Sequence, residues 1–115
     1  MAEHRIDSLV EKVIHRNTTW TRTRGLMFTF GMGDEAHIFH FGRARRLQFH
    51  MFFVFHPIDI IFLNDETVVD VKEGFFPFTV YTSKVPADTA IEVPEGFIRE
   101  HGIKPTDTVR IETNS

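Results

Sequence analysis

The stretch from Phe49 to Leu63 constrains the fold of this chain most, because nearly all of its side chains are apolar. A helix that crosses a lipid bilayer needs roughly 20 consecutive, predominantly apolar residues. This run is 15 residues long and contains a proline, Pro57, and an aspartate, Asp59. We therefore expect it to be buried inside a soluble domain and not to cross a membrane.

Pro57 divides this run, because proline has no N–H group to donate to a β ladder. Two strands are therefore predicted between Gln48 and Leu63, with a break near Pro57. Alternation along the first strand places on one face, which we expect to be buried, Phe49, Met51, Phe53 and Phe55. The other face is mixed, as in a strand covered on both sides, and carries His50, Phe52, Val54 and His56.

Short apolar segments separated by turn residues recur along the rest of the chain. Further strands are predicted at residues 36–42, 67–72, 75–82, 89–94 and 107–112, in addition to the strand 58–64 that follows Pro57. Short helices are predicted over residues 3–14 and 94–102, although residues 9–15 also fit a strand. This pattern indicates a mainly β fold, α+β at the margin, in the form of a compact antiparallel β-sandwich or barrel with one or two short helices. With 115 residues, we expect one domain, residues 1–115.

Local patterns predict how neighbouring strands connect. The segments 36–42 and 46–55 flank the basic tip Arg43–Arg46, which is typical of a hairpin. A turn is predicted at residues 64–66, leading into the strand 67–72. Alternation in that strand places Val69 and Val71 on one face, opposite Val68 and Asp70.

The composition excludes several kinds of site and partner. The chain has no cysteine, which rules out disulfides, thiolate nucleophiles and thiolate metal ligands. A net charge of −3 and a pI of about 6.1 argue against nucleic acid as a partner. Residues 1–16 contain scattered charges and no apolar signal-peptide core, so we expect a cytoplasmic protein.

Three stretches of the chain, residues 17–28, 50–69 and 90–109, carry a resemblance to a known family. In order and spacing they resemble the domain-of-unknown-function 192 family, small proteins of bacteria and archaea. The matching positions are Thr18, Arg22, Gly25, Leu26, Met27, Phe49, Met51, Pro57, Asp59, Phe62, Glu92, Pro94, Gly96 and Asp107. His50 stands where the family has a tryptophan, and Thr106 stands where it has a glycine. The resemblance implies a small, mainly β, jelly-roll-like domain and no assigned activity.

Asp59 is the most unusual residue of the apolar run, since a buried carboxylate is costly unless it is paired or hydrogen-bonded. One hypothesis makes it a general acid or base with a raised pKa. With Glu92 it would then form a two-carboxylate, glycosidase-like site, since such hydrolysis uses two carboxyl groups that flank the scissile bond. The alternative hypothesis is structural: Asp59 accepts backbone N–H bonds, or pairs with Arg22 or Arg24.

Histidine and arginine supply the remaining candidate groups. His37, His40, His50 and His56 could be metal ligands, but their spacing contains no HxH or HExxH pattern, so we expect no bound metal and no cofactor. The basic tip Arg43, Arg45 and Arg46, with Arg22 and Arg24, could bind a phosphate or a polyanion. The tip could equally be a solvated end that keeps an edge strand soluble.

Taken together, these patterns favour a small non-catalytic binding or accessory domain whose ligand is unidentified. The first alternative is a hydrolase that uses Asp59 and Glu92 in a cleft on the sheet face. The second is a structural protein that forms homo-oligomers through its Phe-rich strands, since extended apolar patches usually mark interfaces.

Overall fold

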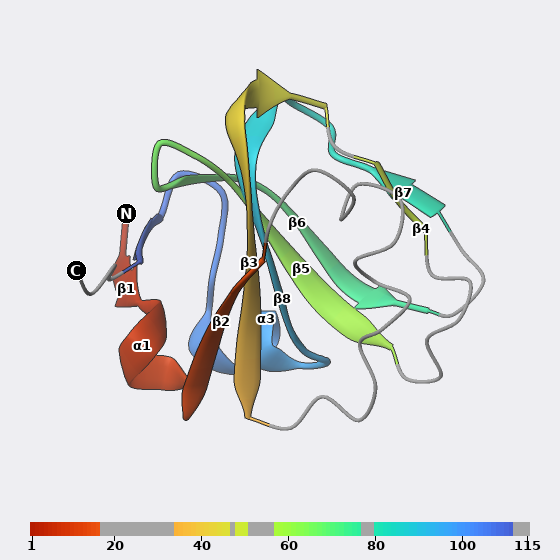
Figure 1. Ribbon diagram of the computed structural model, residues 1–115. Coiled ribbons are helices and arrows are strands. Elements are labelled where there is room, and N and C mark those ends of the chain that lie inside the picture. Colours follow the sequence, from red (N-terminus) through yellow and green to blue (C-terminus); the bar gives the residue numbers. More distant parts are fainter. Residues whose placement is uncertain (17–33, 47, 51–56, 77–79, 112–115) are drawn as a thin grey trace.

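The structure, a computed structural model, describes residues 1–16, 34–46, 48–50, 57–76 and 80–111 (Figure 1). It is mainly β with two short helices, as the sequence predicts. The elements are β1 (Glu3–Arg5), α1 (Ile6–Leu9), β2 (Lys12–Arg16), β3 (Glu35–Arg45), β4 (Gln48–His50), β5 (Ile58–Asn64), β6 (Thr67–Phe75), β7 (Val80–Thr82), β8 (Ala87–Pro94), α3 (Phe97–His101) and β9 (Thr108–Arg110).

Seven of the strands form one sheet in the order β1-β9-β6-β5-β8-β3-β2, while β4 and β7 form a separate antiparallel pair. The central strands are antiparallel, as predicted, whereas the edge pairs β1–β9 and β2–β3 are parallel. A jelly-roll-like sandwich with two facing sheets stays a prediction.

The connection between the two outermost strands explains why the large sheet curls. In a flat sheet, strands about 4.8 Å apart would separate β1 from β2 by about 29 Å. The chain from Arg5 to Lys12 spans at most about 25 Å even when fully extended, and α1 shortens it further. The sheet therefore bends into a half-barrel, with α1 between its two edges (Figure 1).

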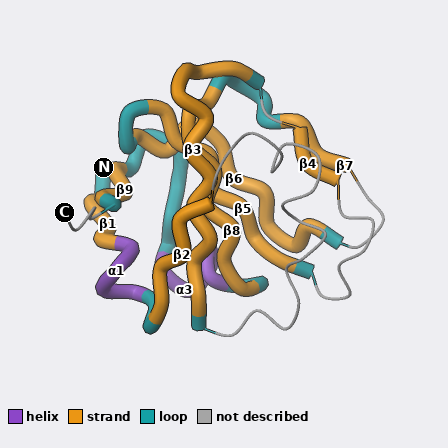
Figure 2. The backbone as a smooth tube through the Cα atoms, viewed as in Figure 1, coloured by secondary structure: helices purple, strands orange, loops and turns teal. Residues whose placement is uncertain are grey.

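Buried side chains form two clusters on opposite faces of this sheet. The aliphatic core contains the inward-facing residues of β3, β5 and β8, such as Ile38, Ile61 and Val93, together with Ile6 of α1 and Ile98 of α3. The aromatic core lies on the other face and consists of Phe39, Phe41, Ile58, Ile60, Phe62, Phe75, Ala87 and Ala90, with Val69 and Tyr81 packed against it. Figure 2 shows both helices toward one side of the molecule and the β4–β7 pair toward the other.

The apolar run behaves as predicted where the structure describes it. β4 ends at His50 and β5 begins at Ile58, so two strands flank Pro57. Residues Ile58–Leu63 are all buried, which agrees with a strand covered on both faces. Met51, Phe52, Phe53, Val54, Phe55 and His56 and the side chain of Phe49 lie outside the described residues, so their burial stays a prediction.

The predicted helix over residues 3–14 is wrong in extent. Only α1 is helical, and β2 occupies much of the segment 9–15, for which the sequence also allowed a strand. The physical reason is tertiary: β3 offers backbone partners to β2 over five residue pairs. A single helical turn without a side-chain cap has little stability of its own.

The predicted hairpin around Arg43–Arg46 is also wrong. β3 continues through Arg45 and pairs with β8 and β2, whereas β4 pairs with β7. Gly42 has a φ of 80°, and the β3–β8 register shifts between His40 and Arg45. Such an irregularity bends a strand without ending it.

The turn between β5 and β6 is present at the predicted place. Asp65 and Glu66 have positive φ values of 54° and 67°, the backbone of a type I′ hairpin turn. The predicted faces of β6 are wrong, however, because its register with β5 shifts between Phe62 and Leu63. As a result, Val69 packs against the aromatic core and Val71 against the aliphatic core.

Candidate functional site

Asp59 lies on the aliphatic face of β5 and is 0% exposed. Its Oδ1 accepts the N–H of Gly74 at 2.9 Å, and its Oδ2 accepts the N–H groups of Gly96 at 3.1 Å and Ile98 at 3.0 Å. Gly96 can present its N–H here because its φ of 90° is readily adopted only by glycine. One carboxylate thus joins β5, β6 and the beginning of α3.

These contacts match one of the two structural environments that the sequence allowed for Asp59, namely backbone N–H donors. Arg22 and Arg24, the alternative partners, lie outside the described residues. A carboxylate that accepts several N–H bonds is well satisfied inside a protein. The geometry therefore supports a structural role in which Asp59 holds α3 against the sheet.

A polar hollow, which we call the Asp59 cavity, opens beside this carboxylate. Its volume is about 310 Å³, and it is lined by Asp59, Glu73, Gly74, Glu95, Gly96 and Arg99. Arg99 Nε lies 3.6 Å from Glu73 Oε1, and both side chains are well exposed. The lining is thus acidic overall, with one guanidinium at the rim.

Glu92 is buried on β8 but does not meet Asp59. Its Cα partners are Ile60 of β5 and His37 of β3, whereas Asp59 pairs with Val93. Residues that pair across a ladder share a face, and successive residues alternate between faces. Asp59 therefore points to the aliphatic core and Glu92 to the aromatic core, so the structure does not bring the two carboxylates into one cleft.

The histidines are likewise divided between the two faces. His37 is buried beside Glu92, with its Nε2 3.0 Å from Glu35 Oε1. His40 points to the opposite face, where its Nε2 lies 3.0 Å from Nδ1 of His15. Within the described ranges, no three His, Asp or Glu side chains are placed to hold a metal ion. The side chain of His50 and all of His56 lie outside those ranges.

The predicted basic site is described only in part. Arg43 and Arg46 are exposed at the end of β3, and Arg46 Nε donates to the backbone oxygen of Ser83 at 3.1 Å. The side chain of Arg45 lies outside the described residues, as do Arg22 and Arg24. Binding of a phosphate at this tip stays a prediction.

Asp70 forms a network that the sequence did not reveal. Its Oδ2 accepts the hydroxyl of Tyr81 at 2.6 Å and the N–H of Lys84 at 2.8 Å, while its Oδ1 accepts the N–H of Val71 at 2.9 Å. Burial, together with the hydrogen bond to Asp70, raises the pKa of Tyr81 well above its ordinary value. The network fixes residues 81–84 against β6. In the sequence, the one indication of this network is that Asp70 stands alone in a valine-rich strand.

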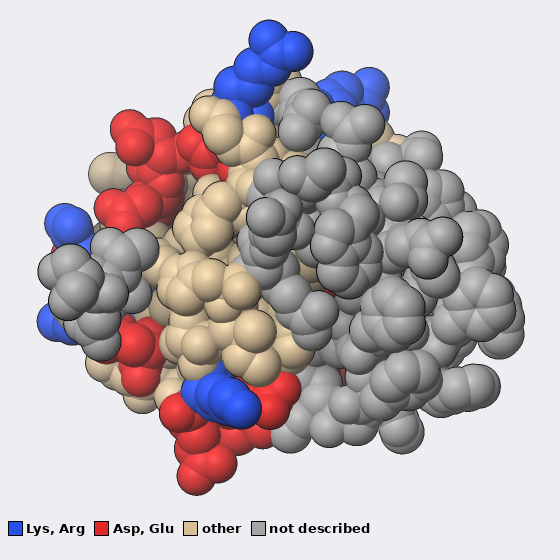
Figure 3. Space-filling model, in the orientation of Figure 1, with Lys and Arg blue, Asp and Glu red and all other residues tan. Residues whose placement is uncertain are grey.

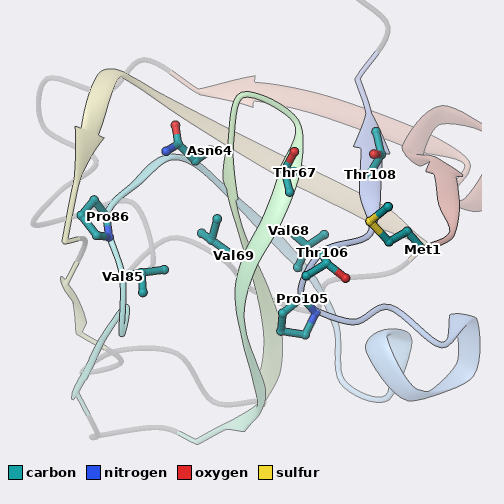
Figure 4. A pocket seen from close by; sticks show the side chains of 10 residues that line it. All are labelled: Met1, Asn64, Thr67, Val68, Val69, Val85, Pro86, Pro105, Thr106 and Thr108. Carbon is teal, nitrogen blue, oxygen red and sulfur yellow. The ribbon is translucent and has the colours of Figure 1, made fainter.

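A larger hollow, which we call the apolar groove, lies next to this network and was also missed by the sequence. Its volume is about 720 Å³. Figure 4 shows Val85 and Pro86 on one side of β6, with Pro105 and Thr106 on the other. The full lining is Met1, Asn64, Thr67, Val68, Val69, Val85, Pro86, Pro105, Thr106 and Thr108, and none of these side chains is charged.

Comparison with known protein families identifies relatives of the chain. The DUF192 family model, "Uncharacterized ACR", matches residues 3–111 and confirms the resemblance seen in the sequence. A UPF0127 protein of Thermococcus sibiricus is 39% identical over 85 residues, which cover 71% of this chain and 54% of the relative. The chain thus spans about half the length of that relative.

Two solved structures share the fold. A protein of unknown function from Novosphingobium aromaticivorans is 28% identical with a TM-score of 0.75, over 84% of this chain and 71% of that one. A structure from Sinorhizobium meliloti, named as a proposed transcription regulator, is 24% identical with a TM-score of 0.74, over 82% of this chain and 76% of that one. At that identity the second likeness shows the fold alone.

Proposed function

Because this chain belongs to the DUF192 family of uncharacterised proteins, whose name assigns no activity, we propose a function from its geometry. The chain is a small, single-domain, non-catalytic binding protein that takes an uncharged, mostly apolar small molecule in the apolar groove. One observation carries this proposal: the groove is large, open to solvent and lined by uncharged side chains. Sites for small molecules are typically hollows of about 300–1,000 Å³, mostly apolar with a few polar groups.

The lining argues for the chemistry of the ligand. An ionised group would lose hydration in the groove without meeting an oppositely charged side chain, which is unfavourable. The side chains of Asn64, Thr67, Thr106 and Thr108 can donate and accept hydrogen bonds, so they suit hydroxyl, carbonyl or amide groups. Val69, Val85 and the two prolines supply the apolar surface.

The walls of the groove are held in place by hydrogen bonds to β6, which favours a preformed site. On one side, the N–H of Lys84 donates to Asp70, next to Val85. On the other side, the N–H of Thr106 donates to the backbone oxygen of Val68 at 2.8 Å. The N–H of Val68 in turn donates to the backbone oxygen of Asp107 at 2.7 Å. A preformed site reduces the entropy lost on binding.

The alternatives from the sequence receive less support. A hydrolase with Asp59 and Glu92 requires both carboxylates around one bond, and they lie on opposite faces of the sheet. Self-association through Phe-rich strands rests mostly on residues outside the described ranges. Among the described phenylalanines, Phe39, Phe62 and Phe75 are buried and Phe76 is 55% exposed.

Charge and helix length bear on other partners. In Figure 3, acidic side chains gather on the left and at the bottom of the visible face, and basic side chains stand in separate places. Over the described residues of this face, the basic side chains form no continuous surface of the kind on which nucleic-acid binding relies. Of the helices in the described part of the chain, none has the length and apolar character needed to span a bilayer. The cytoplasmic location stays a prediction.

Binding of Nile red, an uncharged apolar dye, tests the proposal. Val85 is 40% exposed on the groove wall, so Val85→Asp should leave the protein folded but place a carboxylate in the binding surface. We expect at least a tenfold loss of dye affinity, because the carboxylate would lose hydration when the dye covers it. A tenfold loss corresponds to about 1.4 kcal/mol of binding free energy. The matched control is Phe76→Asp, which adds the same charge at an exposed apolar residue outside the groove lining.

The two variants separate specific from general binding. Loss in Val85→Asp with wild-type affinity in Phe76→Asp supports the groove. Equal affinity in both variants, whether retained or lost, would refute it.

A further inference from the structure

His15 of β2 and His40 of β3 form a contact that the proposed function does not use. His15 Nδ1 lies 3.0 Å from His40 Nε2, and the two ring planes differ by 8°. Their centroids are 5.2 Å apart, which is the nitrogen–nitrogen distance plus about one ring radius on each side. The rings therefore lie end to end in nearly one plane, joined by an N–H···N hydrogen bond, and not face to face.

This bond depends on the number of protons that the pair holds. In a neutral pair, one facing nitrogen carries a hydrogen and the other offers its lone pair. With one added proton, the bond becomes charge-assisted and stronger. With two added protons, both facing nitrogens carry hydrogen, neither can accept, and two positive charges stand 3.0 Å apart.

The position of the His15–His40 hydrogen bond means that its loss would weaken the pairing of β2 with β3. Among the described strands, β2 is the last of the large sheet, and β3 is its one partner there. The pair lies near the end of the β2–β3 ladder, which runs from Lys12 and Glu35 to Arg16 and Phe39. We propose that the His15–His40 pair is a pH-sensitive switch: it holds the end of β2 on β3 near neutral pH, and it releases that end when both rings are protonated, exposing the outer edge of β3.

Neighbouring charges modulate this switch without replacing it. From β8, Asp88 acts on His40, and its carboxylate also accepts the hydroxyl of Thr89 and the N–H of Asp65. From α1, which packs against β2, Asp7 is paired with Arg5 at 3.6 Å. Burial lowers the pKa of His40, the charge of His15 lowers it further, and Asp88 raises it.

The lowered pKa of His40 determines how the stability of the protein changes with pH. An unfolded chain takes up the His40 proton near the ordinary pKa of about 6.5, whereas the folded chain takes it up only at lower pH. The stability contributed by the neutral ring is therefore complete above about pH 6.5 and is lost as the pH falls below it.

Hydrogen exchange in wild type and His40→Gln tests the switch. A glutamine side chain carries both a donor and an acceptor, so it can pair with His15 in either protonation state. The backbone amides of β2 should exchange equally in both proteins at about pH 7.5. As the pH falls from about 6.5 towards about 4, they should exchange increasingly faster in wild type, by about tenfold or more once both rings are protonated. Comparing both proteins at the same pH removes the intrinsic pH dependence of exchange.

A second variant, His15→Gln, should give the same result from the opposite side of the pair, and His101→Gln on α3 should behave as wild type. A β2 exchange rate that is equal in wild type and both pair variants throughout the range from about pH 6.5 to about 4 would overturn the proposal. So would a difference of the same size at acid and neutral pH, because the pair would then act as an ordinary structural contact.

Discussion

The Asp59 cavity and the apolar groove are two hollows of opposite character. The cavity borders a buried carboxylate whose two oxygens already accept three backbone N–H groups. The groove is lined by valine, proline, threonine, asparagine and methionine side chains, whose apolar surface gains from being covered. A buried charge in a hollow is therefore not by itself a sign of chemistry. What matters is whether the lining groups are already satisfied within the protein.

The largest expected effect concerns Asp59. Asp59→Ala leaves three backbone N–H groups without their acceptor, and each such buried group costs about 1–3 kcal/mol. We expect a loss of at least about 3 kcal/mol in the free energy of unfolding, measured by urea denaturation. Asp59→Asn should cost less, because its remaining carbonyl oxygen still accepts at least one of these N–H groups.

The catalytic interpretation of Asp59 makes the opposite prediction, since active-site groups often reduce stability. A midpoint that is unchanged or raised in both variants would show that the Asp59 cavity is not a structural joint. The contrast between the two hollows would then disappear.

A smaller effect is expected at the network that supports one groove wall. Tyr81→Phe removes the hydroxyl that donates to Asp70, while the N–H bonds of Lys84 and Val71 remain. We expect a loss of about 1–2 kcal/mol in unfolding free energy. Dye binding in the apolar groove should weaken but persist, and an unchanged stability would argue that this hydrogen bond adds little.

The same network predicts an alkaline titration. Tyr81 is the one tyrosine of the sequence, so its ionisation can be followed by absorbance without overlap from another tyrosine. Its pKa is raised by burial and by Asp70, so the folded protein should keep the phenol neutral well beyond about pH 10. Stability should fall above about pH 10, where only the unfolded chain loses this proton. Ionisation at the ordinary pKa would contradict the buried contact.

An acid titration tests the opposite groove wall. Asp107 accepts the N–H groups of Ala2 and Lys104 and lies 3.0 Å from Nε2 of His4, and these bonds lower its pKa to about 2. The unfolded chain binds this proton near pH 3.8, so the stability from Asp107 is present above that pH and is lost between about 3.8 and 2. Asp107→Asn should flatten the pH dependence in this interval, and an unchanged slope would contradict it.

The smallest expected change in stability is in the apolar groove itself. Val85→Asp should alter the unfolding free energy by no more than about 0.5 kcal/mol, because the side chain is partly exposed and borders solvent. Together with a lost dye affinity, this result would separate binding from stability. A large destabilisation would instead make the groove part of the packed interior.

Several elements could be predicted because local physics decides them. The strand 58–64 is apolar on both faces, the turn at residues 64–66 follows it, and Gly102 ends α3 with a φ of 62°. Other expectations failed where a partner strand overrode the local pattern. β2 formed instead of a longer helix because β3 provides its hydrogen bonds, and the faces of β6 changed because its register with β5 shifts.

Apolar periodicity and the backbone chemistry of proline predicted the mainly β class, the break at Pro57 and the burial of Ile58–Leu63, because both act over a few residues. The order and spacing of short motifs indicated the family by resemblance. The tertiary structure was needed to show that Asp59 and Glu92 face opposite cores, since strand register places their pairing partners. It also assembled the apolar groove from residues near 64–69, 85–86 and 105–108, which no local pattern connects. Such sites arise from the packing of distant segments, and that packing is set by the strand order of the whole sheet.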